Sequence, residues 1–267
     1  MDYVGRDKSN PITSFGIILY TRTHNNQYLY LIGKRRDSIS YSEFLKNNLT
    51  EDNIVMHINL MSDEERKRCI DHYKNNTFEI LWDDLWINHN HRMYRYEYNR
   101  CNVSFYKNME KYLEIFTDPL ITSRRDNPWS FFKGRKHYTE TSLRCALREF
   151  EEETTINQDQ LSVLNIDPLV ETYVGTDNRL YQTIYFVAYI SYQPFIYIKY
   201  TSNRLRKTRV SDEISTVLWV TYTQACEMLQ DNSVGCDNRV DIIRKVNNIL
   251  LFEPAIKRSK IRRARSR

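Results

Sequence analysis

Apolar residues near the start of the chain and in its second half follow the spacing of β-strands. Residues 12–22 and 28–34 are short runs rich in Ile, Leu and Tyr, separated by the turn-forming His24-Asn25-Asn26. This pattern predicts an opening β-hairpin. Further strands are expected from similar runs at residues 129–133, 168–174, 180–192 and 214–220.

Helical spacing replaces the strand pattern between residue 41 and about residue 118. Ser62 and Glu65 form a capping box that predicts a helix start. Another helix is expected at 102–116, and one at 77–86 should face inward through Ile80, Leu81, Leu85 and Trp86. Two more helices are expected at 222–231 and 239–251.

The order of these elements predicts an α/β/α sandwich around a mixed sheet. The opening hairpin needs later strands to complete its sheet, so residues 12–40 and 126–252 should form one domain. A mostly helical insert at 41–125 splits it, and a basic tail at 253–267 follows.

Positive charge is concentrated at two places. Residues 257–267 hold seven of the 39 basic residues and no acidic one, so the rest of the chain has a small negative net charge. Arg92, Arg95 and Arg100 alternate with tyrosines. Both stretches suit RNA, through phosphate contact and base stacking. A solubilising or nuclear-localisation-like end and inward-packed tyrosines are the alternatives.

The five cysteines are scattered, odd in number and without a CxxC pair. This usage favours a reducing intracellular compartment over a disulfide scaffold. The sequence shows no apolar run near 18 residues and no signal-peptide pattern at residues 1–11, so we expect no membrane partner. Nothing in it specifies an oligomeric state.

A helix from about Thr141 would place apolar residues on one arc and three carboxylates, Glu149, Glu152 and Glu153, on another. Like charges at this spacing repel each other, and a divalent cation removes that repulsion. Oxygen ligands suit Mg²⁺ or Mn²⁺, which predicts metal-assisted attack of water on a phosphate chain. A solvated acidic helix face is the alternative.

The full spacing resembles the signature of the Nudix hydrolases. It spans residues 134–156 and consists of Gly134, Glu140, Arg148-Glu149, Glu152-Glu153 and Ile156. The chain departs at Thr155, where the family has glycine; threonine in a left-handed helix cap costs about 1–2 kcal/mol. The resemblance implies that the three glutamates hold the metal and that Arg148 pairs with Glu152.

The sequence next to this signature extends the resemblance. Lys133, Arg135 and Lys136 flank the expected phosphate position. The run from Arg35 to Glu43, the insert and Trp129 are similar to the mRNA-decapping Nudix hydrolases of large DNA viruses, of the poxvirus and African swine fever virus type. That family implies hydrolysis of capped mRNA to 7-methyl-GDP and 5′-monophosphate RNA, with the insert and tail holding the RNA body.

The same resemblance assigns residues to the cap. Tyr181 matches one stacking position, where cation–π attraction holds 7-methylguanine. Ile39 falls at the other, with Tyr41 as a substitute. Asp177 would accept a hydrogen bond from the guanine edge, and Glu213 would act as general base, with Glu153 as the fallback.

Two other functions stay open at this stage. A small polyanion such as a diphosphoinositol or dinucleoside polyphosphate could be the substrate, or the fold could be an inactive RNA-binding module. Viral decapping would take place in the host cytoplasm or a viral factory, or the protein would be a virion component.

Overall fold

The computed structural model describes residues 10–86, 92–119, 121, 128–175, 179–192, 214–230 and 238–252. Asp177, Glu213 and the tail at 253–267 lie outside these residues. The chain forms two compact units, one of Met1–Lys34 with Trp129–Arg267 and one of Arg35–Pro128. The insert therefore begins six residues earlier and ends three residues later than the sequence pattern suggested.

The first unit contains an eight-stranded mixed sheet. Its strands are β1 (Ile12–Arg22), β2 (Tyr28–Arg35), β3 (Trp129–Ser130), β4 (Phe132–Arg135), β5 (Ser162–Val163), β6 (Leu169–Val174), β7 (Leu180–Tyr189) and β8 (Ile214–Val220). The strand order is β3-β2-β1-β7-β5, while β4 pairs with β1, β6 with β7 and β8 with β2. β1 and β7 are parallel, and β1 pairs antiparallel with β2 and β4, which confirms the mixed sheet.

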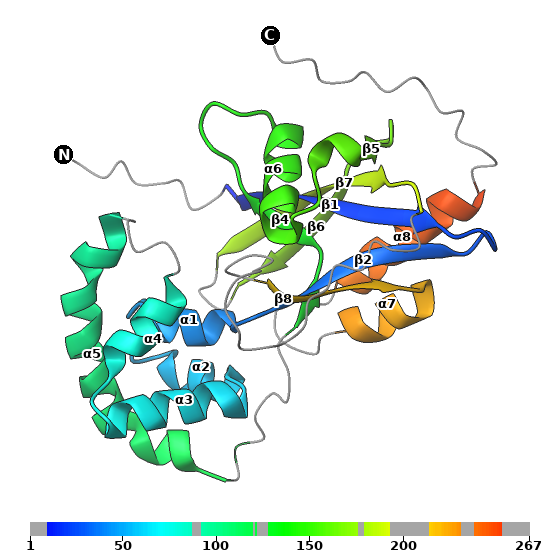
Figure 1. Ribbon diagram of the computed structural model, residues 1–267. Coiled ribbons are helices and arrows are strands. Elements are labelled where there is room, and N and C mark those ends of the chain that lie inside the picture. The colour runs from blue at the N-terminus through cyan, green and yellow to red at the C-terminus, as the bar shows by residue number, and fades with distance from the viewer. Residues whose placement is uncertain are drawn as a thin grey trace. The chain divides into compact units, whose positions relative to one another are not determined.

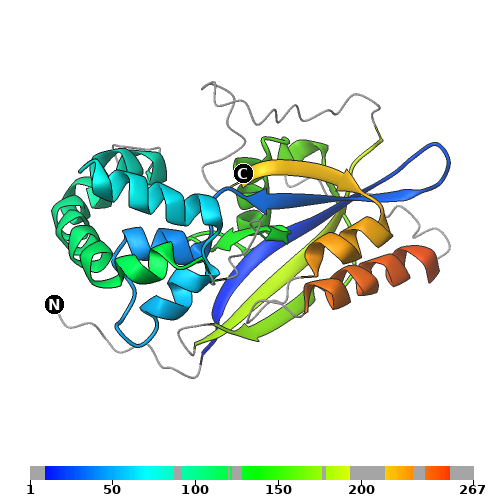
Figure 2. The same ribbon diagram turned by 90° about the horizontal axis from the view of Figure 1, so that it is seen from below.

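Helices cover both faces of this sheet. α6 (Ser142–Thr154) lies on one face, and α7 (Tyr222–Leu229) and α8 (Arg239–Phe252) lie side by side on the other (Figures 1 and 2). Alternation along β1 separates the two cores: Ile17 packs with Phe150 of α6, whereas Ile18 packs with Ile243 of α8. The predicted sandwich is present.

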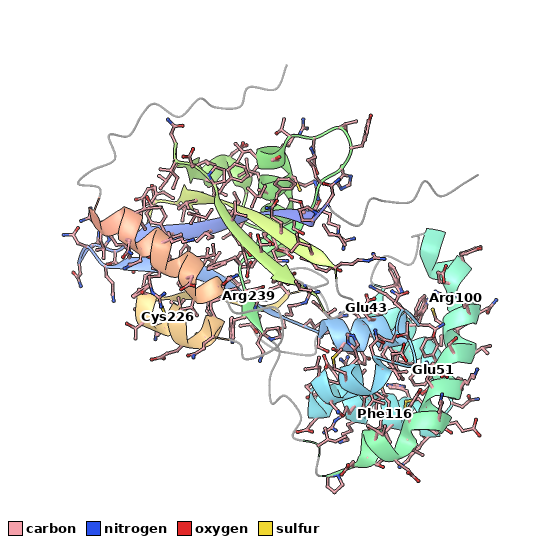
Figure 3. All side chains as sticks on the ribbon, turned by 180° about the vertical axis from the view of Figure 1, so that it is seen from behind. Glu43, Glu51, Arg100, Phe116, Cys226 and Arg239 are labelled. Carbon is pink, nitrogen blue, oxygen red and sulfur yellow. The ribbon has the colours of Figure 1, made fainter. Side chains whose placement is uncertain are left out.

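A buried polar cluster ties α8 to the sheet. Glu171 of β6 is 2% exposed and accepts a hydrogen bond of 2.9 Å from the Tyr185 hydroxyl of β7. Arg239, labelled on α8 in Figure 3, faces Glu171 and donates a 2.8 Å hydrogen bond to the Trp129 carbonyl. Burial raises the pKa of Tyr185, so the hydroxyl stays protonated as a donor.

The second unit is a helical bundle of α1 (Ile39–Leu45), α2 (Ile54–Leu60), α3 (Asp63–Lys74), α4 (Phe78–Leu85) and α5 (Arg92–Thr117). Its core is built of aromatic rings, among them Phe44, Phe78, Trp82, Phe105 and Phe116. Phe116, labelled in Figure 3, is 3% exposed. None of the described helices has the length and apolar character needed to cross a lipid bilayer.

The capping box at Ser62 and Glu65 is confirmed, and its carboxylate has a second role. Glu65 accepts hydrogen bonds from the backbone and hydroxyl of Ser38, the N-cap of α1, at 2.6 and 2.9 Å. One buried carboxylate thus satisfies groups at the starts of two helices. The sequence pattern did not predict α1 or α2.

Two expectations for the insert need correction. Ile80 is 55% exposed, because α4 begins at Phe78 and turns Phe78, Leu81 and Trp82 inward. α5 extends ten residues further toward the N-terminus than the expected helix at 102–116, so the arginine and tyrosine stretch is helical.

Candidate active site

The Nudix-like segment forms the turn into α6 and the helix itself. Thr141 caps the helix by accepting a hydrogen bond from the Arg144 backbone at 3.2 Å. Its apolar arc, including Ala146 and Phe150, packs into the core beneath β1 and β4. The polar arc of the helix carries Glu149 and Glu152, while Glu153, predicted on the same arc, is buried.

Gly134 on β4 lies directly under Glu149. A Cβ atom at this position would stand 2.0 Å from the Glu149 carboxyl carbon, far inside van der Waals contact. Only a glycine lets this carboxylate pack against the strand. The fixed glycine of the signature therefore has a steric cause in this fold.

Arg148 connects oxygen atoms of four residues around the helix. Its Nε and Nη2 atoms donate to the two oxygens of Glu140 at 3.1 and 2.8 Å, and Nη2 also reaches the Arg135 carbonyl at 3.2 Å. Nη1 donates to Glu149 at 2.8 Å and to Glu152 at 3.1 Å. The expected pair with Glu152 is present, and Glu140 and Glu149 join it.

These contacts shift the acidity of the groups involved. The hydrogen bonds from Arg148, with one of 2.7 Å from the His137 backbone, lower the pKa of Glu140 to about 2. In turn, Glu140 first and then Glu149 and Glu152 raise the pKa of Arg148. Burial, followed by the charges of Glu140 and Glu149, raises the pKa of the Cys145 thiol to about 12, so Cys145 is an inert core residue.

The three predicted metal ligands occupy different environments. Glu153 is 8% exposed and accepts a 3.0 Å hydrogen bond from the Lys133 backbone, while the side chain of Glu152 is 59% exposed. Among the described residues, no three Asp, Glu, His or Cys side chains form a group that could hold a metal ion as they stand. The donor chemistry, carboxylate oxygens on one helix face, fits Mg²⁺ or Mn²⁺, but Arg148 engages Glu149 and Glu152.

Lys133 and Arg135, which flank Gly134, contribute backbone groups to this site. Gly16 of β1 pairs with Lys133, and a Cβ at Gly16 would lie 2.8 Å from the Lys133 Cβ and 3.1 Å from the Tyr185 ring. The Lys133 side chain therefore leaves β4 on the face of Tyr185, opposite α6. Alternation directs Arg135 the same way, and exposed Lys136 follows the strand.

Tyr181 has a partner that sequence reasoning missed. It pairs in register with Tyr173 of β6, and the two rings stack with centroids 5.4 Å apart at 8°. Alternation from Tyr185 places both rings on the sheet face opposite α6. The sequence offered one signal for this pair. Tyr173 stands one residue before the end of β6 and Tyr181 one residue after the start of β7, so a hairpin connection places them opposite each other.

Tyr41 is a core residue, which corrects its assignment as a stacking surface. It is 1% exposed, and the Arg68 guanidinium lies over its ring, 4.4 Å from the centroid. Stacking a ligand there would require opening the bundle. Ile39, at the start of α1, is 58% exposed and stays a prediction.

The three arginines predicted to contact RNA, Arg92, Arg95 and Arg100, lie on α5. The Arg100 side chain is 51% exposed, pairs with Glu97 and donates to the Lys46 carbonyl at 3.3 Å (Figure 3). Arg92 and Arg95 are in the first turns of the helix, and their side chains lie outside the described residues.

Comparison with known proteins agrees with this geometry. Residues 117–236 match the model of the NUDIX domain. The chain contains a Nudix domain. A protein of Acanthamoeba polyphaga mimivirus, named provisionally as an mRNA-decapping protein, is 26% identical over 230 residues, or 76% of this chain and 61% of that protein. The chain thus spans less than two thirds of that relative's length.

Two further similarities concern a second viral protein and a solved structure. The mRNA-decapping protein g5R of African swine fever virus (isolate Warthog/Namibia/Wart80/1980) is 28% identical over 184 residues, covering 66% of this chain and 72% of that protein. Among solved structures, an Ap4A hydrolase from C. elegans is 11% identical, with a TM-score of 0.45 over 90% of this chain and 98% of that one.

Proposed function

We propose that this Nudix hydrolase removes the 5′ cap of mRNA, releasing 7-methyl-GDP and RNA with a 5′-monophosphate. One observation carries the proposal: the similarity to two viral proteins named for decapping, which covers 66–76% of the chain and so exceeds the Nudix domain match. The proposed place of action is the host cytoplasm or a viral factory.

The proposed chemistry uses the carboxylate face of α6. Glu149, Glu152 and Glu153 would hold Mg²⁺ or Mn²⁺, which would stabilise charge on the phosphates and lower the pKa of water. Glu153 is fixed by the Lys133 backbone, and Arg148 orients Glu149 and Glu152. Glu213 is the proposed general base, with Glu153 as the alternative.

Cap recognition is proposed to involve Tyr181 and Asp177. A 7-methylguanine is cationic, so the electron-rich ring of Tyr181 would attract its face. The stacked Tyr173 supports this role, because it fixes the plane of the Tyr181 ring before any ligand arrives. Asp177 would accept from the guanine edge.

The RNA body is proposed to bind the exposed face of α5 and the basic tail at 257–267. Tyr96, Arg100, Val103 and Lys107 recur at helical spacing and are all exposed, with Tyr96 at 78%. Cations and an exposed aromatic ring suit a single strand. Arg92 and Arg95 precede this face in the sequence.

Product analysis of cap-labelled RNA, with and without divalent metal, tests the proposal. We expect 7-methyl-GDP only with metal, competition by uncapped RNA, and at least a hundredfold loss of rate in Glu152→Gln. The proposal fails if capped RNA stays intact while dinucleoside or diphosphoinositol polyphosphates are cleaved. Binding of RNA without hydrolysis of any of these substrates would instead indicate an inactive module.

A further inference from the structure

The guanidinium of Arg148 is divided between two kinds of contact. Nε and Nη2 face Glu140 and the Arg135 carbonyl, whereas Nη1 is shared by Glu149 and Glu152. One end of the side chain therefore contacts the turn that enters α6. The other end contacts two of the three proposed metal ligands.

The end on Glu140 is firmly held. Two parallel charge-assisted hydrogen bonds join the guanidinium to both carboxylate oxygens, a geometry with high directional specificity. Glu140 is itself fixed by the His137 backbone at 2.7 Å. Arg148 can therefore stay in place when Nη1 loses its partners.

The Nη1 end lies between groups that repel each other. Glu149 and Glu152 are three residues apart on α6, and the positive charge of Nη1, at 2.8 and 3.1 Å, offsets their repulsion. This is the electrostatic task that a divalent cation would perform on the same carboxylates. A guanidinium and a metal ion cannot both use the same carboxylate lone pairs fully.

We propose, on the basis of the function above, that Arg148 is a built-in counter-ion that competes with the metal. Loading Mg²⁺ or Mn²⁺ requires Nη1 to release Glu149 and Glu152, while Nε and Nη2 remain on Glu140. Arg148 thus keeps the glutamates oriented without metal and sets how readily they accept one. A purely positioning arginine would raise metal affinity, and a competing one lowers it.

Mn²⁺ binding to the full chain separates these roles, measured by electron paramagnetic resonance of free Mn²⁺ without RNA. We expect Arg148→Gln to bind Mn²⁺ at least about threefold more tightly, because a nearby positive charge is gone. Arg148→Lys keeps the charge and should bind within about twofold of the parent. Equal or weaker binding by a folded Arg148→Gln variant, checked by circular dichroism, overturns the inference.

The parent protein provides a test that does not depend on the folding of a variant. Nitrogen-15 NMR of the Arg148 side chain during Mg²⁺ titration should show the Nη signal shifting and the Nε–H staying protected from exchange. No change in the Nη signal at saturating Mg²⁺ overturns the inference. Both readouts omit RNA, so they can succeed even if capped RNA is not the substrate.

Discussion

The carboxylate of Glu149 occupies the space where a side chain at Gly134 would begin, with 2.0 Å between the Glu149 carboxyl carbon and the position of a Cβ. Gly134→Ala should therefore displace Glu149, lower stability by about 1–3 kcal/mol and reduce activity at least tenfold. Urea unfolding and initial rates measure the two effects. In a double-mutant cycle, Glu149→Ala should restore most of the stability lost in Gly134→Ala, and simple additivity would contradict the steric account.

Thr155 carries a backbone strain that the sequence indicated. Its φ of 59° is left-handed, and its N–H closes the helix on the Glu151 carbonyl at 2.8 Å. We expect Thr155→Gly to stabilise the protein by about 1 kcal/mol, since relief of strain exceeds the entropy cost of glycine. Thermal unfolding measures it. Asn76→Gly, at a φ of 55°, is the control and should gain less, because asparagine tolerates this conformation.

The pair of Glu140 with Arg148 should make stability depend on acid. The folded pKa of Glu140 is lowered from 4.5 to about 2, so its contribution is fully present above pH 4.5 and is lost as pH falls toward 2. Urea midpoints between pH 5 and pH 2 should fall more steeply for the parent than for Glu140→Gln. Parallel curves for the two proteins would show that Glu140 does not make this contribution.

Tyr181 should govern cap affinity if it stacks on the base. Tyr181→Ala is expected to raise KM for capped RNA about tenfold by loss of cation–π attraction, with a smaller effect on kcat. Tyr181→Phe keeps the ring and should remain within about threefold of the parent. If alanine and phenylalanine give the same KM, the ring does not contact the cap.

The exposed face of α5 should control the salt dependence of RNA binding. Lys107→Gln combined with Arg100→Gln should weaken binding and flatten the plot of log Kd against log salt, since about one counter-ion is released for each phosphate contact. Fluorescence anisotropy with labelled RNA measures the slope. Lys67→Gln combined with Lys74→Gln, at two exposed positions of α3, is the control, because it removes the same charge from another helix. An equal change of slope in the control would show that this face of α5 makes no specific contact with the RNA.

The sequence predicted the elements whose bounds follow from local periodicity. It failed for features that depend on contacts between distant parts of the chain. β1, β8 and the start of α6 were predicted with their bounds, because apolar runs and caps are local signals. The helix α1 has a local cap at Ser38 but only 7 residues, too few for a helical period to repeat, and was therefore missed. Tyr41 was misassigned because the burial of an aromatic ring depends on the bundle around it.

The candidate site shows the same division. Spacing alone predicted three carboxylates along α6; in the structure Arg148 engages Glu149 and Glu152 and Glu153 is buried, so their joint role as metal ligands stays a prediction. The resemblance implied the pair of Arg148 with Glu152. Spacing on the helix could not show that Arg148 also joins Glu140, because Glu140 lies in the turn before α6. Nor could it show that Lys133 contributes its backbone, which follows from strand register.

The chain leaves the sheet and returns to it at neighbouring positions. Lys34 at the end of β2 pairs with Trp129 of β3, and the Arg35 backbone donates to the Pro128 carbonyl at 3.3 Å. Topologically, the entire helical bundle is thus an enlarged hairpin loop. Natural selection can lengthen, shorten or exchange such a loop without altering the strand order of the sheet, so the bundle and the sheet can evolve at separate rates.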